Sequence, residues 1–263
     1  MNLFRPYSAG EPQRDARGRL VGIDRYQDVL GRNWKRFAGT GLLTILGFAP
    51  LGLGTAYAVL SSSVLVQLAA CVLGGAVAGP FLACLYDGLL RALRDAPGSW
   101  RENTRRALRQ NVRGAIWPGI LTGLFLGAAS FAGVMLFFWR SVFPGLGTIL
   151  VYLVSWLLFF VLATLYWPQL VLFEMPNRQR LRNMLLFMLR YPLPVLGAAV
   201  LQLVFWLLMV LFAPWTLLLL PLVGAWFPLF AALFVLYNKL DEAFGLEARI
   251  AQAFPEQTPQ YDD

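Results

Sequence analysis

Six long apolar runs, none of which contains Asp, Glu, Lys or Arg, constrain the fold of this 263-residue chain more than any other feature. Each run is close to the ~20 residues that an α-helix needs to cross about 30 Å of hydrocarbon. They are Ala38–Leu60, Val64–Tyr86, Ile116–Trp139, Thr148–Phe173, Val195–Phe212 and Trp215–Tyr237. Only 14% of the residues are charged, whereas a soluble domain carries about 25%. The sequence therefore predicts an all-α, polytopic transmembrane bundle with six spans.

The basic residues are concentrated in alternate connections between these runs. Of the 22 Lys and Arg residues, positions 1–37 hold eight, 87–115 hold seven, 174–194 hold four, 238–263 hold two, and Arg140 is the remaining one. Cytoplasmic connections of membrane proteins carry an excess of Lys and Arg. We therefore predict a multi-pass protein of the cell inner (cytoplasmic) membrane, built from three helical hairpins, with both termini in the cytoplasm. If Pro214 kinks one helix instead of marking a turn, there are five spans and the tail lies outside.

This pattern divides the chain into three parts. Residues 1–37 form a basic cytoplasmic segment with an interfacial helix, residues 38–237 form the transmembrane domain, and residues 238–263 form a cytoplasmic tail. The net charge of +8 therefore belongs to segments that flank membrane spans, where it sets topology and attracts anionic lipid headgroups. A basic patch on a folded soluble surface would be expected of a nucleic-acid binder, so we expect no nucleic-acid partner.

The connections on the basic side are predicted to be amphipathic helices. A capping box, Ser99-Trp100-Arg101-Glu102, predicts a helix that begins at Ser99 and extends to about residue 113. Its apolar positions recur every four residues with arginines opposite, as in helices that lie in the headgroup region. Similar stripes predict helices within 23–37 and 177–191, and a weaker one through Leu240, Phe244 and Ile250. The arginines expected to contact lipid headgroups or a partner are Arg101, Arg105, Arg106, Arg109, Arg113, Arg178, Arg180 and Arg182.

Small residues within the spans predict close helix packing. The third run contains Gly119, Gly123 and Gly127 at four-residue spacing, and the second contains Gly75 and Gly79 at the same spacing. Glycines in this pattern let the backbone of another helix approach closely. The partner helix is either in the same chain or in a second copy of a homo-oligomer.

The few polar residues and the prolines of the spans each allow two interpretations. Gln67 and Gln202 are the most polar residues well inside the runs. They either form hydrogen bonds between helices or line a polar path for a small solute. Pro50, Pro80 and Pro118 kink their helices, either for packing or, as in some transporters, to expose backbone to a solute.

Several classes of activity lack their usual residues. The chain has no His, and its two cysteines show no metal-site spacing. Its spans contain no ionisable acid or base, although coupled transporters usually place such groups within the membrane. No nucleophile–base pair and no phosphate-binding glycine loop is apparent. We therefore expect a protein that is not an enzyme and that has no catalytic residues, metal or cofactor.

The stretch Ala78–Tyr86, followed by the charged segment through Thr104–Asn111 and the run from Ile116, resembles the YesL family of bacterial integral membrane proteins of unassigned function. Arg180–Pro194 and Asn238-Lys239-Leu240 are also similar to that family. The resemblance implies an accessory or permease-like component linked to carbohydrate uptake or use, with a membrane transport partner.

Two alternatives to this function stand beside it. One is a solute channel or facilitator that uses the kinked helices. The other is a membrane scaffold or regulator that docks a partner on the helix at 99–113.

Overall fold

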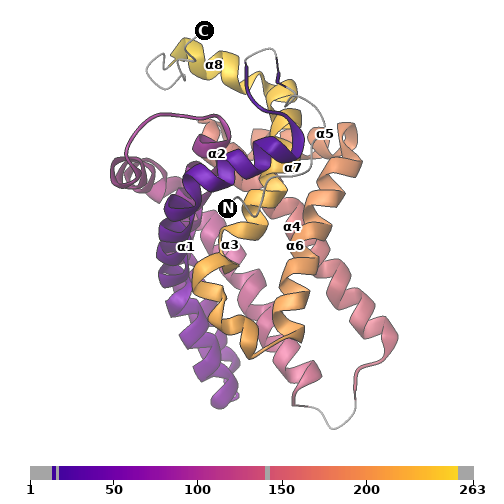
Figure 1. Cartoon of the computed structure of the whole chain (residues 1–263). Helices are drawn as coiled ribbons and strands as arrows, with labels where there is room; N and C mark the ends of the chain where they lie inside the picture. Colours follow the sequence, from indigo (N-terminus) through magenta and orange to yellow (C-terminus); the bar gives the residue numbers. More distant parts are fainter. Residues whose placement is uncertain (1–13, 16–17, 140–142, 254–263) are drawn as a thin grey trace.

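The computed structural model describes residues 14–15, 18–139 and 143–253. Apart from one isolated bridge between Arg14 and Leu20, the described residues contain no β-structure, and the predicted all-α bundle is confirmed (Figure 1). The α-helices are α1 (Gly22–Leu60), α2 (Val64–Leu93), α3 (Trp100–Phe137), α4 (Leu146–Leu172), α5 (Asn177–Arg190), α6 (Pro192–Leu211), α7 (Phe227–Phe244) and α8 (Leu246–Ala253).

Six helical segments are long and apolar enough to cross a membrane: α1, α2, α3, α4, α6 and Leu220–Phe244. The six-span prediction is therefore confirmed, and Pro214 lies in a turn between the last two spans. The last span is less regular than the sequence suggests, because a 3₁₀ segment (Trp215–Leu218) and a π segment (Leu220–Gly224) precede α7. Prolines at positions 221 and 228 explain the irregularity, since each removes a backbone N–H donor and its ring clashes with the preceding turn.

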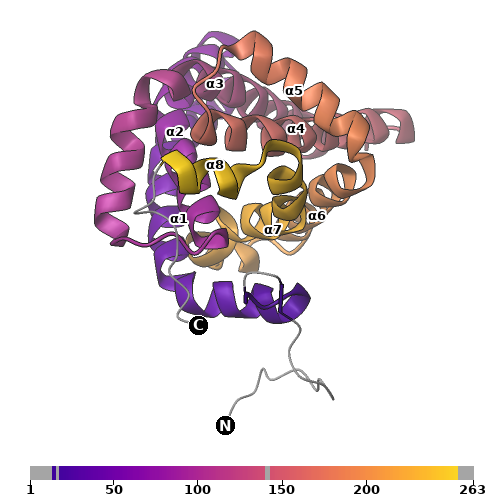
Figure 2. The same cartoon turned by 90° about the horizontal axis from the view of Figure 1, so that it is seen from above.

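The amphipathic segments before the first and third spans are continuous with those spans. Helix α1 runs from Gly22 through the boundary expected at residue 38, and α3 runs from Trp100 into the span expected from Ile116. Seen from above, the N-terminal parts of both helices lie across the end of the bundle before the helices turn downward (Figure 2). The N-cap bond of the predicted capping box forms: the Ser99 hydroxyl accepts a hydrogen bond from the Glu102 N–H at 3.3 Å.

The predicted tail stripe is split between two helices. Helix α7 continues to Phe244 and ends at Gly245, whose φ of 57° is left-handed, before α8 begins at Leu246. A left-handed glycine is a common way to end a helix. Leu240 and Phe244 therefore belong to the last span, and Ile250 belongs to the separate helix α8.

Helix α2 lies at the centre of the bundle and α4 near its outside. Over the most apolar 18-residue window, 56% of α2 is buried within the protein but only 11% of α4. Two apolar clusters form the core. The first contains residues of α1, α2, α3, α4 and α7, and the second contains residues of α4, α5, α6, α7 and α8. Tyr86 of α2 stacks on Trp167 of α4, with ring centroids 6.2 Å apart.

One end of the bundle carries all of the amphipathic segments. The N-terminal parts of α1 and α3, together with α5 and α8, lie at the same end in both views (Figures 1 and 2). We call this the basic end, because positions 18–36, 91–113, 178–190 and 239–249 hold its Lys and Arg residues. The segregation of charge along the sequence is thus a segregation in space.

Candidate functional site at the basic end

The five glycines of the sequence motif lie at the contact between α2 and α3, which we call the glycine seam. A Cβ atom placed on Gly75 would lie 2.6 Å from the carbonyl oxygen of Gly119, and one on Gly123 would lie 2.6 Å from the Cα of Gly75. Gly79 faces the carbonyl oxygen of Ala115 more closely still, and Gly127 faces the Cys71 Sγ. The glycine seam therefore packs backbone against backbone within one chain.

The two intramembrane glutamines are buried in separate places. The Gln202 Nε2 of α6 donates to the Thr164 Oγ1 of α4 at 2.7 Å, and Gln67 of α2 donates to the Thr55 Oγ1 of α1 at 3.2 Å. Both side chains are nearly inaccessible, with 1% and 6% of their surface exposed. Both glutamines therefore form hydrogen bonds between helices, which is one of the two roles expected for them from the sequence.

Four arginines form an exposed row on the first part of α3. Arg101, Arg105, Arg109 and Arg113 follow one another at four-residue spacing, and all four are exposed. We call this row the arginine stripe. Among the residues that the structure describes, no acid forms an ion pair with any of them, whereas the neighbouring Arg106 lies 3.8 Å from Glu102.

The arginines of α5 are placed differently from one another. Arg178 and Arg182 are exposed, but only 6% of Arg180 is. The Arg180 guanidinium donates to Asn177 Oδ1 at 2.7 Å and to the Met175 carbonyl at 3.1 Å, and it stacks over the Tyr166 ring at 5.1 Å. Arg180 is therefore a packing residue that holds α5 against α4, and the expectation that it contacts lipid headgroups or a partner does not fit its position.

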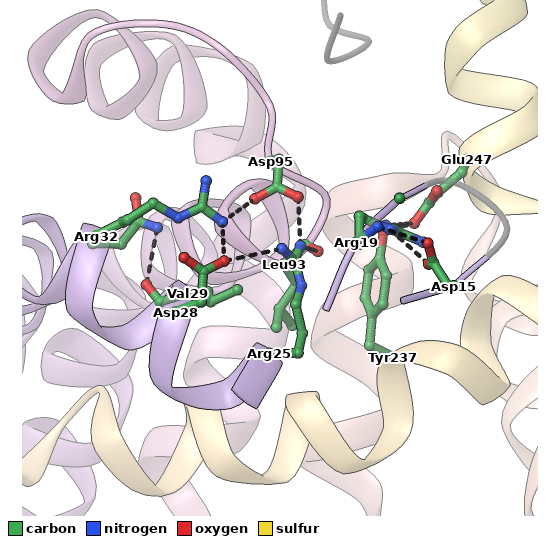
Figure 3. A network of polar contacts seen from close by, with 12 residues as sticks. Asp15, Arg19, Arg25, Asp28, Val29, Arg32, Leu93, Asp95, Tyr237 and Glu247 are labelled. Carbon is green, nitrogen blue, oxygen red and sulfur yellow. Dashed lines mark hydrogen bonds and ion pairs between the residues drawn. The ribbon is translucent and has the colours of Figure 1, made fainter. Parts of the chain in front are cut away.

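Ion pairs of the buried Arg25 and the exposed Arg32, which were not predicted from the sequence, connect α1 to the segment after α2 (Figure 3). The Arg25 guanidinium donates to the Leu93 carbonyl at 2.9 Å and to Asp95 at 2.5 Å. Arg32 donates to the other oxygen of Asp95 at 2.8 Å and to Asp28 at 2.7 Å. Asp95 and Asp28 raise the pKa of Arg32, although its partial burial acts in the opposite direction.

A second group of ion pairs joins the N-terminal segment to the last two helices (Figure 3). Arg19 lies 3.0 Å from Asp15 and 2.7 Å from Glu247 of α8. The Tyr237 hydroxyl of α7 donates to the same Glu247 oxygen at 2.8 Å. This group fixes the two ends of the described chain to each other at the basic end.

Helix α2 carries a third buried pair, just past the end of its uncharged run. The Arg91 Nε donates to the Asp87 Oδ2 at 2.7 Å, and 9% and 8% of the two residues are exposed. Arg94 lies one turn further along, where burial lowers its pKa and the charge of Arg91 lowers it further. Charged groups that are this deeply buried need close partners of opposite charge. Asp87 and Arg91 are such partners for each other, and both belong to α2.

A small cavity of about 40 Å³ lies between α1, α2 and the start of α3. The polar side chains around it include Asn33, Arg36, Asp87, Arg91 and Asn103, with Trp100 as an aromatic wall. The Trp100 Nε1 donates to the Thr40 Oγ1 at 2.8 Å, which fixes the indole against α1. Neither Gln67 nor Gln202 lines this cavity, so the structure does not bring them to it.

Part of this site carries a signal in the sequence and part does not. Asp87 and Arg91, like Asp28 and Arg32, are four residues apart, a spacing that places side chains together on a helix. These pairs could have been predicted once the helices were extended beyond the uncharged runs. The contact between Arg25 and Asp95 spans 70 residues, and no local spacing indicates it.

No known family, curated protein or solved structure matches this chain. The resemblance to the YesL family therefore stays a prediction. Within the described residues, no group of three or more Cys, Asp or Glu side chains is placed to hold a metal ion.

Proposed function

We propose that this protein is a non-catalytic, multi-pass membrane component whose basic end lies in the cytoplasm and binds anionic lipid headgroups through the arginine stripe. The observation that carries this proposal is the continuity of α3. One helix contains both the exposed arginines and an apolar span, so the arginines are held next to the hydrocarbon boundary.

The charge of the arginine stripe suits an anionic membrane surface. Each Lys or Arg near such a surface contributes about 1 kcal/mol of attraction, so four contribute on the order of 4 kcal/mol at low ionic strength. Glu102 is the one acid in the first turn of α3, and it faces Arg106. The stripe itself therefore remains available to phosphates.

The accessory role in carbohydrate uptake or use is supported by the resemblance to the YesL family. The scaffold alternative draws on the same exposed helix, since a protein partner with an acidic surface would also fit the arginine stripe. The channel alternative receives less support, because Gln67 and Gln202 are each bonded to a neighbouring helix and neither lines the cavity at the basic end.

Lipid binding by purified full-length protein tests the proposal. We expect the protein to retain phosphatidylglycerol over phosphatidylcholine in mixed nanodiscs, and the variant with all four stripe arginines changed to Gln to lose most of that preference. Changing Arg178 and Arg182 of α5, which are also exposed, to Gln measures how much of the preference other arginines carry, and we expect a smaller loss. An unchanged preference in the four-arginine variant would overturn the proposal.

Orientation is tested by labelling single cysteines with a membrane-impermeant maleimide in intact cells. The two native cysteines are buried, which keeps background labelling low. We expect Ser61→Cys, between α1 and α2, to label and Arg249→Cys, in α8, to label only after the membrane is permeabilised. The reverse pattern would place the basic end outside.

A further inference from the structure

The cavity between α1, α2 and α3 offers both a negative and a positive group to a ligand. Asp87 is 8% exposed and lines the cavity from α2, while Arg36 is exposed and lines it from α1. A purely anionic ligand would meet the Asp87 carboxylate, and a purely cationic one would meet Arg36 and Arg91, which also lines the cavity. The pair therefore favours a ligand that carries both charges.

Asp87 keeps an oxygen atom available for such a ligand. Its Oδ2 accepts from the Arg91 Nε at 2.7 Å. Its Oδ1 accepts no hydrogen bond from any other residue within the described parts of the chain, although a carboxylate can accept several. An ammonium group that entered the cavity would thus find a charge-assisted acceptor.

We propose that this cavity binds the headgroup of a zwitterionic lipid with a primary amine, as in phosphatidylethanolamine. The ammonium group enters the cavity and donates to the Asp87 Oδ1, and the phosphate lies at the rim against Arg36. The location fits a lipid, because the cavity is lined by residues 33–40 of α1, where its amphipathic part meets the uncharged run from Ala38, and by the first turns of α3. This site is separate from the arginine stripe and selects a different headgroup.

The size of the cavity adds selectivity. A volume of about 40 Å³ holds roughly three water-sized groups, which matches the nitrogen and two carbons of an ethanolamine moiety. The trimethylammonium group of a choline lipid is larger and has no N–H to donate. We therefore expect discrimination between two lipids that differ only in methylation of the amine.

Gly88 supplies a variant that fills the cavity with little disturbance elsewhere. It lines the cavity, and a Cβ atom placed on it would find only the Thr40 Oγ1 within 4 Å, at 3.9 Å. Gly88→Ala should be tolerated, since Ala is favoured over Gly inside a helix. Gly88→Leu extends further into the cavity and should block it, and Gly88→Ala is its matched control.

The experiment titrates detergent-solubilised full-length protein with dioctanoyl-phosphatidylethanolamine, -choline and -glycerol, and measures bound lipid by native mass spectrometry. We expect the ethanolamine lipid to bind about tenfold more tightly than the choline lipid, which corresponds to about 1.4 kcal/mol. Gly88→Leu and Asp87→Asn should both abolish this ratio, and Gly88→Ala should keep it. A thermal melt of each variant reports folding, and Gly88→Leu keeps the test valid if Asp87→Asn unfolds because Arg91 loses its partner.

Three results would overturn this assignment: equal affinity for the ethanolamine and choline lipids, a preference that survives in folded Gly88→Leu, or binding of soluble phosphoethanolamine as tight as that of the lipid. The last result would identify a site for a free zwitterion instead. Binding of the glycerol lipid reports on the arginine stripe and should be unchanged in Gly88→Leu. Failure of this inference and failure of the proposed function therefore give different patterns.

Discussion

The first part of α3 and helix α5 share one kind of sequence pattern but expose different residues. Both are arginine-rich amphipathic segments that precede a span, and they lie on different sides of the basic end (Figure 2). In α3 the row from Arg101 to Arg113 is exposed. In α5, Arg180 is buried, and it lies between the exposed Arg178 and Arg182 in sequence. The exposed residues of α5 include the leucines at positions 181, 185 and 189, which are 52%, 59% and 75% exposed.

The difference follows from how each helix is attached. Helix α3 continues without a break from its first turns into the span that packs along the glycine seam, and Trp100 bonds its start to Thr40 of α1. Its arginines are therefore not needed as anchors and can face outward. Helix α5 has only 14 residues and is separated from α6 by Tyr191. It therefore uses Arg180 as a polar anchor to α4 and turns its leucines outward, where hydrocarbon or headgroup carbon can cover them.

Gly119→Val should have the largest effect, because it removes the anchor of α3. A side chain there would lie 2.6 Å from the Cα of Gly79, and overpacking of this kind costs about 1–3 kcal/mol or more. We expect a clear fall in the unfolding midpoint in detergent. Gly114→Ala, at a glycine with nothing within 4 Å, is the control and should be neutral or slightly stabilising. Equal midpoints for both variants would show that α3 is held by other contacts.

Arg180→Gln should release α5. The change removes hydrogen bonds from the guanidinium to Met175 and Asn177 and its stacking on Tyr166. Charged hydrogen bonds contribute about 1.5–3 kcal/mol, so the free energy of unfolding should fall by about 2 kcal/mol. The exposed Arg182 should tolerate the same substitution. Faster amide hydrogen exchange confined to α5 would identify local release, whereas no change would contradict the anchoring role.

The arginine stripe should behave in the opposite way from Arg180. Changing each stripe residue to Gln in turn should leave the unfolding midpoint nearly unchanged, since a surface substitution costs within about 0.5 kcal/mol, and the variant with all four changes should lose less stability per substitution than Arg180→Gln. The same variant should lose its preference for phosphatidylglycerol, and raising the salt concentration should weaken that preference in the wild type. A strong loss of stability would mean that the stripe arginines of α3 anchor their helix, as Arg180 anchors α5.

Glu102→Gln should have the smallest effect of the series. Glu102 is 67% exposed and lies 3.8 Å from Arg106, and exposed pairs contribute about 0–1 kcal/mol. Its side chain is also not the cap of α3, because the cap is the Ser99 hydroxyl. We expect a change of a few tenths of a kcal/mol in stability at most, and a slight gain in binding of anionic lipid. A loss of more than 1 kcal/mol would show that the pair fixes the start of α3.

The spans of this protein are more predictable from its sequence than the site at the basic end is. The apolar runs and the capping box at Ser99 located the helices closely, because both depend on residues near one another in the chain. The uncharged runs placed the ends of α2 and of the last span too early, since α2 continues past Tyr86 to include Asp87 and Arg91 and α7 continues past Tyr237. Two opposite charges on one helix can be buried when they bond to each other. Ending each predicted helix at its first charged residue therefore leaves such a pair out.

The sequence by itself determined that the chain forms apolar helices and that its positive charge lies on one side of them. Hydrocarbon requires long uncharged segments whose backbone groups are bonded internally, and both conditions are local. Only the tertiary structure decided which arginines face outward, which are buried, and that Asp95 meets Arg25. The same holds for the cavity beside Asp87, because α1 must pack against the end of α2 and the start of α3 before it exists.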